Sequence, residues 1–390
     1  MNIALFSDTY PPEINGVATS TYSLHQTLVE HGDKCVVVTT NPYNNKVTFE
    51  DDVLRLPGLY LKWLYGYRAA PIYNSSAMKI LERFKPDVVH CQTDAPVGIF
   101  GTFVANRMHA PLVYTYHTMI EDYAYYFTRG HFDRAARHII RFYFKGKSVR
   151  FNEFIAPSDK TKDYLRSVGI DSTVSVIPTG IDFRRLDPAY KDEADVAALK
   201  EKYGIKPEEF VVLSLGRIAK EKSIDVLLRG YASFLKRSTV PTKFVIVGLG
   251  PAVEELKSLS AHLGIEDHVV FTGPCKPSET QRFYHLGDCF ASASITETQG
   301  LTFMEAMAAH LPVLARFDDN LVGTIQDGKT GFYFLDEEGF ATKLENLISM
   351  SQEEKDKIID SALEAIEPYS LERFYQNEME VYRRVWKENW

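Results

Sequence analysis

Short apolar runs alternate with helix-like segments twice along the chain, and this rhythm constrains the fold more than any other feature. The expected buried strands are Asn2–Phe6, Lys34–Thr39, Val88–His90 and Leu112–Tyr116, then Val211–Ser214, Phe244–Val247, Val269–Phe271, Cys289–Ala291 and Val313–Ala315. The expected helices are Tyr22–His31, Asn74–Phe84, Ile224–Lys236, Ala252–Leu263, Ser278–Leu286 and Leu301–His310. Continuous apolar strands separated by helices predict an α/β fold with two parallel sheets, each covered by helices on both faces.

The length of 390 residues is sufficient for two domains of this kind. A charged, turn-rich segment over 178–188 marks the boundary, which predicts a first domain over 1–180 and a second over 181–370. The last segment, 371–390, is rich in aromatic and charged residues and is a candidate for packing back on the first domain. Ligands of such sheets bind at the carboxyl ends of the strands, so we expect a site in a cleft between the domains.

Composition excludes several classes of protein. The net charge of −8 argues against nucleic-acid binding. The four cysteines are scattered and none forms C-x-x-C, which argues against a disulfide framework or a zinc site. The chain lacks D-x-D spacing and metal-ligand clusters, so we expect no metal and no cofactor. We also expect no signal peptide, because the apolar start ends at Ser7, and no spanning helix.

The segment 294–308 carries two carboxylates, Glu297 and Glu305, with a glycine between them. If Leu301–His310 is helical, Glu305 lies in its first turn and Glu297 in the preceding loop. Both would then flank a helix N-terminus, where free backbone N–H groups favour an anion such as phosphate. The alternative is an acidic loop followed by a capped core helix.

Two further turns follow predicted strands. Gly16 closes the turn after the first strand, where the lack of a side chain permits close approach of a ligand to the backbone. Arg217 and Lys222 follow the first strand of the second half and are suited to a diphosphate, since arginine offers a planar fork and lysine a mobile charge. The alternatives are a plain strand-to-helix turn and a solvated basic turn. The Gly-Leu-Gly of residues 248–250 lacks the third glycine of a dinucleotide site.

Two features of the first half point to a sugar and to a membrane. His117 ends a strand, where it is either a sugar-binding or proton-shuttling group or a structural histidine. Arg134, Arg137, Arg141 and Lys145 recur at helical spacing opposite an apolar face. This pattern is typical of a helix at an anionic membrane surface, or of an ordinary surface helix. The aromatic stretch of residues 59–68 suits a water–lipid interface.

Together these residues resemble the retaining glycosyltransferases of family 4, which have the GT-B fold of two Rossmann-like domains. The resemblance covers nearly the whole chain and depends mainly on Glu297-x7-Glu305, the Gly216-Arg217…Lys222 turn, Gly16, and residues 178–182 at the domain boundary. Many family members have Phe-Gly after the first glutamate, whereas here Thr298-Gln299-Gly300 intervenes. That variant, with the sequence around His117, looks like bacterial 1,2-diacylglycerol 3-glucosyltransferases.

The resemblance implies a role for each matching residue. Arg217 and Lys222 hold the diphosphate of a nucleotide sugar, which Gly16 also approaches, and Glu305 holds the ribose. Glu297 and the backbone of Thr298, Gln299, Gly300 and Leu301 hold the sugar, with His117 near its C6 hydroxyl. Glu297 and His117 are the candidate catalytic groups, and Glu121, Asp122 and Tyr123 are candidates for the acceptor.

The implied reaction moves a hexose from a nucleotide sugar to diacylglycerol with retention of configuration. Glucose from UDP-glucose is expected, and galactose or another nucleotide base is the alternative. The enzyme would be cytoplasmic and peripheral on the inner face of the cell membrane. Three alternatives remain from the sequence: a family 4 enzyme acting on a glucosylated diacylglycerol, on phosphatidylinositol or on a soluble sugar. A non-catalytic binding protein is a fourth, and the complete set of four charged residues (Arg217, Lys222, Glu297 and Glu305) argues against it.

Overall fold

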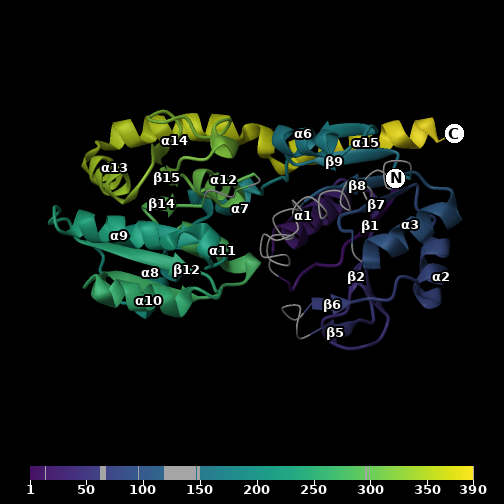
Figure 1. Cartoon of the computed structure of the whole chain (residues 1–390), viewed down its shortest axis with the longest axis horizontal. Coiled ribbons are helices and arrows are strands. Elements are labelled where there is room, and N and C mark those ends of the chain that lie inside the picture. The colour runs from purple at the N-terminus through teal and green to yellow at the C-terminus, as the bar shows by residue number, and fades with distance from the viewer. Residues whose placement is uncertain are drawn as a thin grey trace. The chain divides into compact units, whose positions relative to one another are not determined.

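The computed structural model describes residues 1–13, 15–61, 67–94, 96–117, 146, 150–294, 297 and 299–389. The chain divides into two compact units. Unit 1 contains residues 1–180 together with 371–390, and unit 2 contains residues 181–370 (Figure 1). Each unit is built on one large sheet with helices, so the predicted α/β class with two Rossmann-like domains is confirmed.

The sheet of unit 1 has the strand order β10-β9-β8-β7-β1-β2-β4-β3, and every neighbouring pair is parallel except β3 and β4. A separate antiparallel pair joins β5 and β6. The strands are β1 (Asn2–Phe6), β2 (Lys34–Thr40), β3 (Thr48–Glu50), β4 (Val53–Leu56), β5 (Leu59–Leu61), β6 (Tyr67–Ala69), β7 (Val88–Cys91), β8 (Leu112–Thr115), β9 (Glu153–Ala156) and β10 (Thr173–Val176). The helices are α1 (Gly16–Glu30), α2 (Ser75–Phe84), α3 (Pro96–Met108), α6 (Asp159–Ser167) and α15 (Leu371–Glu388).

The sheet of unit 2 has the order β13-β12-β11-β14-β15-β16 and is parallel throughout. Its strands are β11 (Phe210–Leu215), β12 (Thr242–Val247), β13 (Val269–Gly273), β14 (Cys289–Ser292), β15 (Val313–Arg316) and β16 (Phe332–Phe334). Its helices are α7 (Phe183–Leu186), α8 (Glu193–Lys202), α9 (Ile224–Leu235), α10 (Val253–His262), α11 (Thr280–Tyr284), α12 (Leu301–Ala308), α13 (Glu337–Ser349) and α14 (Gln352–Ile366).

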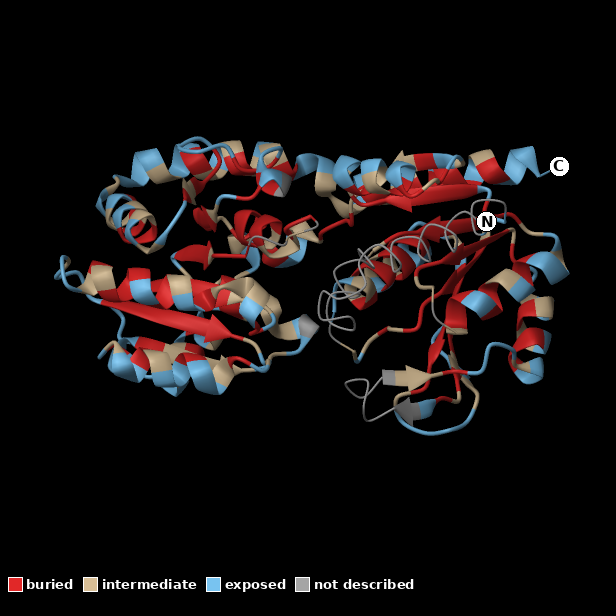
Figure 2. Cartoon of the chain, in the orientation of Figure 1, coloured by how far each residue is buried: buried red, intermediate tan, exposed pale blue. Residues whose placement is uncertain are grey.

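Both sheets are buried on their two faces, which explains why their strands read as continuous apolar runs. In β1, Ala4 and Phe6 join one core cluster while Ile3 and Leu5 join another, as the alternation of side chains along a strand requires. Figure 2 shows the buried strands flanked by helices that are buried on one side and exposed on the other.

Helix α15 lies within unit 1, although it is the last element of the chain (Figure 1). Its apolar residues Met379, Tyr382 and Val385 are buried in the same core cluster as Ile3 and Leu5 of β1. Arg384 donates to the buried carboxylate of Glu153 in β9, with Nη2 2.5 Å from Oε1. The C-terminal segment therefore completes one face of the unit 1 sheet.

Several predicted boundaries were wrong by a few residues. Helix α1 begins at Gly16 rather than at Tyr22, because Asn15 caps it by accepting a hydrogen bond from the N–H of Ala18. The expected helix Ser278–Leu286 begins as a short 3-10 turn and continues as α11. Helix α3 was not predicted, because its apolar residues show no clear period and it contains two glycines.

Candidate functional site

Lys222 and Glu297 meet at the carboxyl end of the unit 2 sheet. Lys222 ends the short 3-10 turn η2 (Lys220–Lys222) that follows β11, and Glu297 lies in the loop after β14. The Lys222 Nζ donates to Glu297 Oε1 at 2.7 Å and lies 3.5 Å from the hydroxyl of the buried Ser294. The Glu297 side chain is 12% exposed and the Lys222 side chain is 30% exposed, so both reach solvent. Two groups that lie 75 residues apart in the chain thus form one charged centre.

Arg217 lies in the same turn after β11, and its side chain is 58% exposed. Its Nη1 is 3.7 Å from Glu221 Oε1, a contact too long and too exposed to hold the guanidinium strongly. The planar fork is therefore accessible to an anion at this strand end.

Helix α12 begins at Leu301, four residues after Glu297, and its N-cap residue Gly300 makes no side-chain cap hydrogen bond. Gly300, the residue before it, has φ +75°, and a Cβ there would lie 2.5 Å from Leu321 Cδ2. Glycine is thus required both by backbone conformation and by packing. The buried Gln299 precedes it, and the backbone N–H of Glu297 donates to Asp318 at 3.3 Å. A helix start at the loop that carries Glu297 is a place where backbone N–H groups and the helix dipole favour an anionic ligand.

The predicted placement of Glu305 in the first turn of α12 was wrong. The helix begins at Leu301 as predicted, but Glu305 is its fifth residue, and the first turn contains no acidic residue. Its carboxylate accepts a hydrogen bond from the hydroxyl of Tyr284 at 2.7 Å. Burial raises the pKa of Glu305, while the Tyr284 hydrogen bond and the charge of Arg185 lower it. Glu305 and Glu297 are therefore in different environments, one held by a tyrosine and the other by a lysine.

The sequence did not show why glycine is needed at both position 248 and position 250. A Cβ on Gly248 would collide with the carbonyl oxygen of Gly216, and a Cβ on Gly250 would collide with that of Ile218. The N–H of Ile218 donates to Leu249 O at 3.1 Å, so the two loops are joined by backbone. The glycines allow the 248–250 loop to support the loop that carries Arg217.

Gly248→Ala is expected to lower the free energy of unfolding by about 1–3 kcal/mol more than Gly216→Ala, because only the first substitution forces two backbones apart. The two glycines have nearly the same φ, +146° and +149°, but a Cβ on Gly216 would meet no atom within 4 Å. Gly216→Ala therefore measures backbone strain alone. Thermal unfolding followed by circular dichroism compares the two variants, and equal losses would contradict the supporting role of the loop.

In unit 1, Gly16 is the first residue of α1, at the carboxyl end of the sheet. It is exposed, its φ is not in the left-handed region, and a Cβ there would meet no atom within 4 Å. Neither the backbone nor the packing of unit 1 requires glycine at this position. This is consistent with close approach of a ligand, as expected from the sequence. The nearby Asp8 has a structural role, since its carboxylate accepts from Thr93 Oγ1 and from the N–H of Val97 in α3.

His117 follows β8 at the same edge of the sheet, and its Nε2 lies 2.5 Å from Gln92 Oε1. Burial lowers the pKa of His117 to about 4. Gln92 follows β7 and is itself buried, and its amide nitrogen is 3.2 Å from Nε2 of the buried His90. Burial, with a smaller contribution from His117, lowers the pKa of His90 to about 3. Both rings are therefore neutral near pH 7. Sequence reasoning did not identify Gln92 or His90, which read as the end of an ordinary strand.

Some predicted residues lie outside the described residues. These are Thr298, the acceptor candidates Glu121, Asp122 and Tyr123, and the basic group Arg134, Arg137, Arg141 and Lys145. Among the residues that the structure describes, no group of histidine, cysteine and acidic side chains has the arrangement of a metal site. No helix in the described ranges is long and apolar enough to cross a bilayer.

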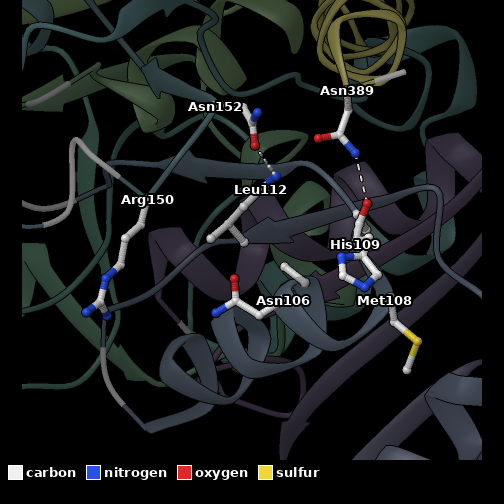
Figure 3. Close-up of a pocket in the computed structure, with 9 residues that line it drawn as sticks. Asn106, Met108, His109, Leu112, Arg150, Asn152 and Asn389 are labelled. Atoms are coloured by element: carbon white, nitrogen blue, oxygen red, sulfur yellow. Dashed lines mark hydrogen bonds between the residues drawn. The ribbon is translucent and has the colours of Figure 1, made fainter.

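A polar pocket of about 520 Å³ lies at the opposite, amino-terminal edge of the unit 1 sheet (Figure 3). Asn152 accepts from the N–H of Leu112 at its wall, and Asn389 donates to the carbonyl of His109. Its lining includes none of the residues singled out above. It therefore has no part in the candidate site.

Comparison with known proteins agrees with this fold. Residues 14–185 match the model of Glycosyltransferase Family 4, and residues 195–364 match that of Glycosyl transferases group 1. The chain belongs to the family 4 glycosyltransferases of the GT-B fold, and it is an enzyme that transfers a glycosyl group.

Two curated relatives are similar along most of their length. The alpha-monoglucosyldiacylglycerol synthase of Streptococcus pneumoniae is 33% identical over 341 residues, which are 87% of this chain and 77% of that protein. The enzyme of the same name from Acholeplasma laidlawii is 34% identical over 342 residues, which are 86% of this chain and 85% of that protein. Among solved structures, a glycosyltransferase from Rickettsia africae has a TM-score of 0.75 at 19% identity, covering 99% of this chain and 98% of its own. That likeness shows the fold alone.

Proposed function

We propose that this enzyme transfers glucose from UDP-glucose to diacylglycerol, with retention of the anomeric configuration and without a metal ion. The observation that carries the proposal is the similarity of most of the chain to two enzymes named alpha-monoglucosyldiacylglycerol synthase. The Lys222–Glu297 pair near the start of α12 supports it, because a lysine and a helix N-terminus suit a diphosphate and the adjacent carboxylate suits a sugar.

In this proposal Arg217 and Lys222 neutralise the charge that grows on the leaving diphosphate. Arg217 is accessible enough to bind phosphate oxygens with its fork, and Lys222 Nζ has N–H bonds beyond the one directed at Glu297. Glu297, oriented by Lys222, accepts hydrogen bonds from sugar hydroxyls. It is a sugar-binding group rather than a nucleophile, and the departing diphosphate takes the acceptor proton.

The remaining assignments follow the family resemblance. Glu305 binds the ribose, and its hydrogen bond from Tyr284 holds the carboxylate in one orientation. Gly16 leaves space for the diphosphate, and His117 forms a hydrogen bond to the sugar near its C6 hydroxyl. A neutral His117 suits this role, because an imidazole carries one donor and one acceptor nitrogen.

A donor-by-acceptor screen with products identified by mass spectrometry tests the proposal. Purified enzyme is incubated with UDP-glucose, UDP-galactose or GDP-mannose, each combined with vesicles containing diacylglycerol, glucosyldiacylglycerol or phosphatidylinositol, or with a soluble sugar. We expect monoglucosyldiacylglycerol as the main product, with an α linkage by NMR. A different main product would replace the proposal with the corresponding family 4 activity, and nucleotide-sugar binding without any product would favour a non-catalytic protein.

Turnover is expected to survive removal of divalent metals, because Arg217 and Lys222 supply the positive charge that a metal would otherwise place on the diphosphate. Activity is measured after dialysis against EDTA and then after addition of Mg²⁺ or Mn²⁺. Loss with EDTA and recovery with either ion would overturn the metal-free mechanism.

Arg134, Arg137, Arg141 and Lys145 are expected to contribute about 1 kcal/mol each to binding at an anionic membrane surface. Substitution of all four by Glu should abolish flotation with anionic vesicles but preserve slow hydrolysis of UDP-glucose. Binding of the wild-type enzyme should weaken as salt rises, since exposed charges are screened over about 8–10 Å. Wild-type protein that does not float with anionic vesicles at low salt would contradict the membrane role.

A further inference from the structure

We propose that Gln92 is a positioning residue that holds the His117 imidazole in the tautomer with its hydrogen on Nε2. This inference rests on the proposed role of His117 in the transfer reaction. It concerns a residue that neither the sequence motifs nor the family resemblance identified.

The first step is the contact between the two side chains. The Nε2 of His117 and the Oε1 of Gln92 are 2.5 Å apart, a short hydrogen bond. An amide oxygen accepts and cannot donate, so Nε2 must carry the hydrogen. The Nδ1 of the neutral ring then keeps its lone pair, which leaves one defined acceptor on His117.

The second step is the orientation of the Gln92 amide, which His90 determines. The amide nitrogen of Gln92 lies 3.2 Å from His90 Nε2 and 3.3 Å from His90 Nδ1, so the NH₂ group faces the imidazole ring. The Thr115 hydroxyl lies 2.7 Å from His90 Nε2. His90 Nδ1 lies 2.7 Å from the hydroxyl of Tyr382, which hydrogen-bonds in turn to the carboxyl of Glu378. If Tyr382 donates to Glu378, the Tyr382 oxygen accepts from His90 Nδ1, and His90 Nε2 keeps its lone pair. That lone pair attracts the NH₂ end of the Gln92 amide and repels its oxygen, which therefore turns toward His117.

The third step is rigidity. Gln92 is 3% exposed, and His90 and Tyr382 are fully buried. The hydrogen bonds run from Tyr382 of α15 through His90 of β7 and the adjacent Gln92 to His117, so the network is held by packing on several elements of unit 1. The neutral state of His90, which burial favours, keeps the direction of these bonds the same near pH 7. The C-terminal helix thereby determines how a ring at the strand ends is held.

Two measurements test the proposal. In the wild-type enzyme labelled with ¹⁵N in its histidine rings, the His117 signals, assigned by their loss in His117→Ala, should show the Nε2–H tautomer. In Gln92→Met, a shape-conserving change that removes the acceptor, these signals should change toward a tautomer mixture. We also expect kcat to fall about ten- to thirtyfold with a KM for UDP-glucose within about threefold of wild type, because the ring is misdirected while the donor phosphates are still bound.

Ser175→Ala is the matched control, because it removes hydrogen bonds that join Ser175 to Glu153 and Arg384. Within the described residues, Ser175 makes no hydrogen bond to Gln92, His90 or Tyr382. It should leave both kcat and the His117 signals unchanged. An Nδ1–H tautomer in wild type, or unchanged signals and kcat in Gln92→Met, would overturn the inference. Full activity in His117→Ala would instead reject the proposed role of His117, while the spectra of wild type and Gln92→Met would still decide whether Gln92 holds the ring.

Discussion

Glu297→Gln is expected to reduce kcat at least about a hundredfold while the melting temperature changes by no more than about 2 °C. The amide keeps the shape of the side chain but loses the negative charge that Lys222 holds at 2.7 Å. Sugar hydroxyls would lose a charged acceptor, and charge-assisted hydrogen bonds are about twice as strong as neutral ones. The loss of stability should be small, because the Lys222 side chain remains 30% exposed and can be solvated.

Glu209→Gln is the matched control for this experiment. Glu209 is 9% exposed and lies 3.4 Å from Lys243, so it forms a similarly buried glutamate–lysine pair in unit 2. It precedes β11 at the amino-terminal edge of the sheet, away from the strand ends that carry Glu297. Steady-state kinetics and thermal unfolding are measured for both variants. A large fall in melting temperature for Glu297→Gln, with turnover near wild type in the folded fraction, would make Glu297 a structural residue.

Arg217→Ala and Lys222→Ala are each expected to lower kcat/KM about 30- to 150-fold, corresponding to a loss of about 2–3 kcal/mol of transition-state stabilisation. The two variants should differ in stability. Arg217 is more than half exposed, so its removal should not change the melting temperature. Lys222→Ala also removes the cation next to Glu297 and should lower the free energy of unfolding by up to about 1 kcal/mol.

Arg217→Lys separates charge from geometry, because lysine keeps the charge but not the planar fork. We expect its activity to lie between those of wild type and Arg217→Ala. Arg229→Ala serves as the control, since Arg229 is 45% exposed, pairs with Glu337, and belongs to α9 rather than to the strand-end turn. Folded Arg217→Ala and Lys222→Ala variants that turn over at the wild-type rate would remove both cations from the site.

The residues with strong local chemistry could be recognised from the sequence. Glu297, Lys222 and Arg217 each follow an apolar strand, and the ends of parallel strands meet at one edge of a sheet. The α/β fold class followed from the alternation of apolar strands and helices along the sequence. The environment of Glu305 was less accessible, because its hydrogen bond from Tyr284 joins two helices and leaves no pattern in the sequence.

The sequence by itself determined the α/β class and the charged groups of the site, since strand periodicity and residue type are local properties. Only the tertiary structure showed that Gly248 and Gly250 support the Arg217 loop, and that Tyr382 of α15 reaches His90 beneath His117. Such contacts join segments up to 292 residues apart and leave no periodic pattern. They arise from close packing and from the need of buried polar groups for partners, and both are decided only when the elements come together.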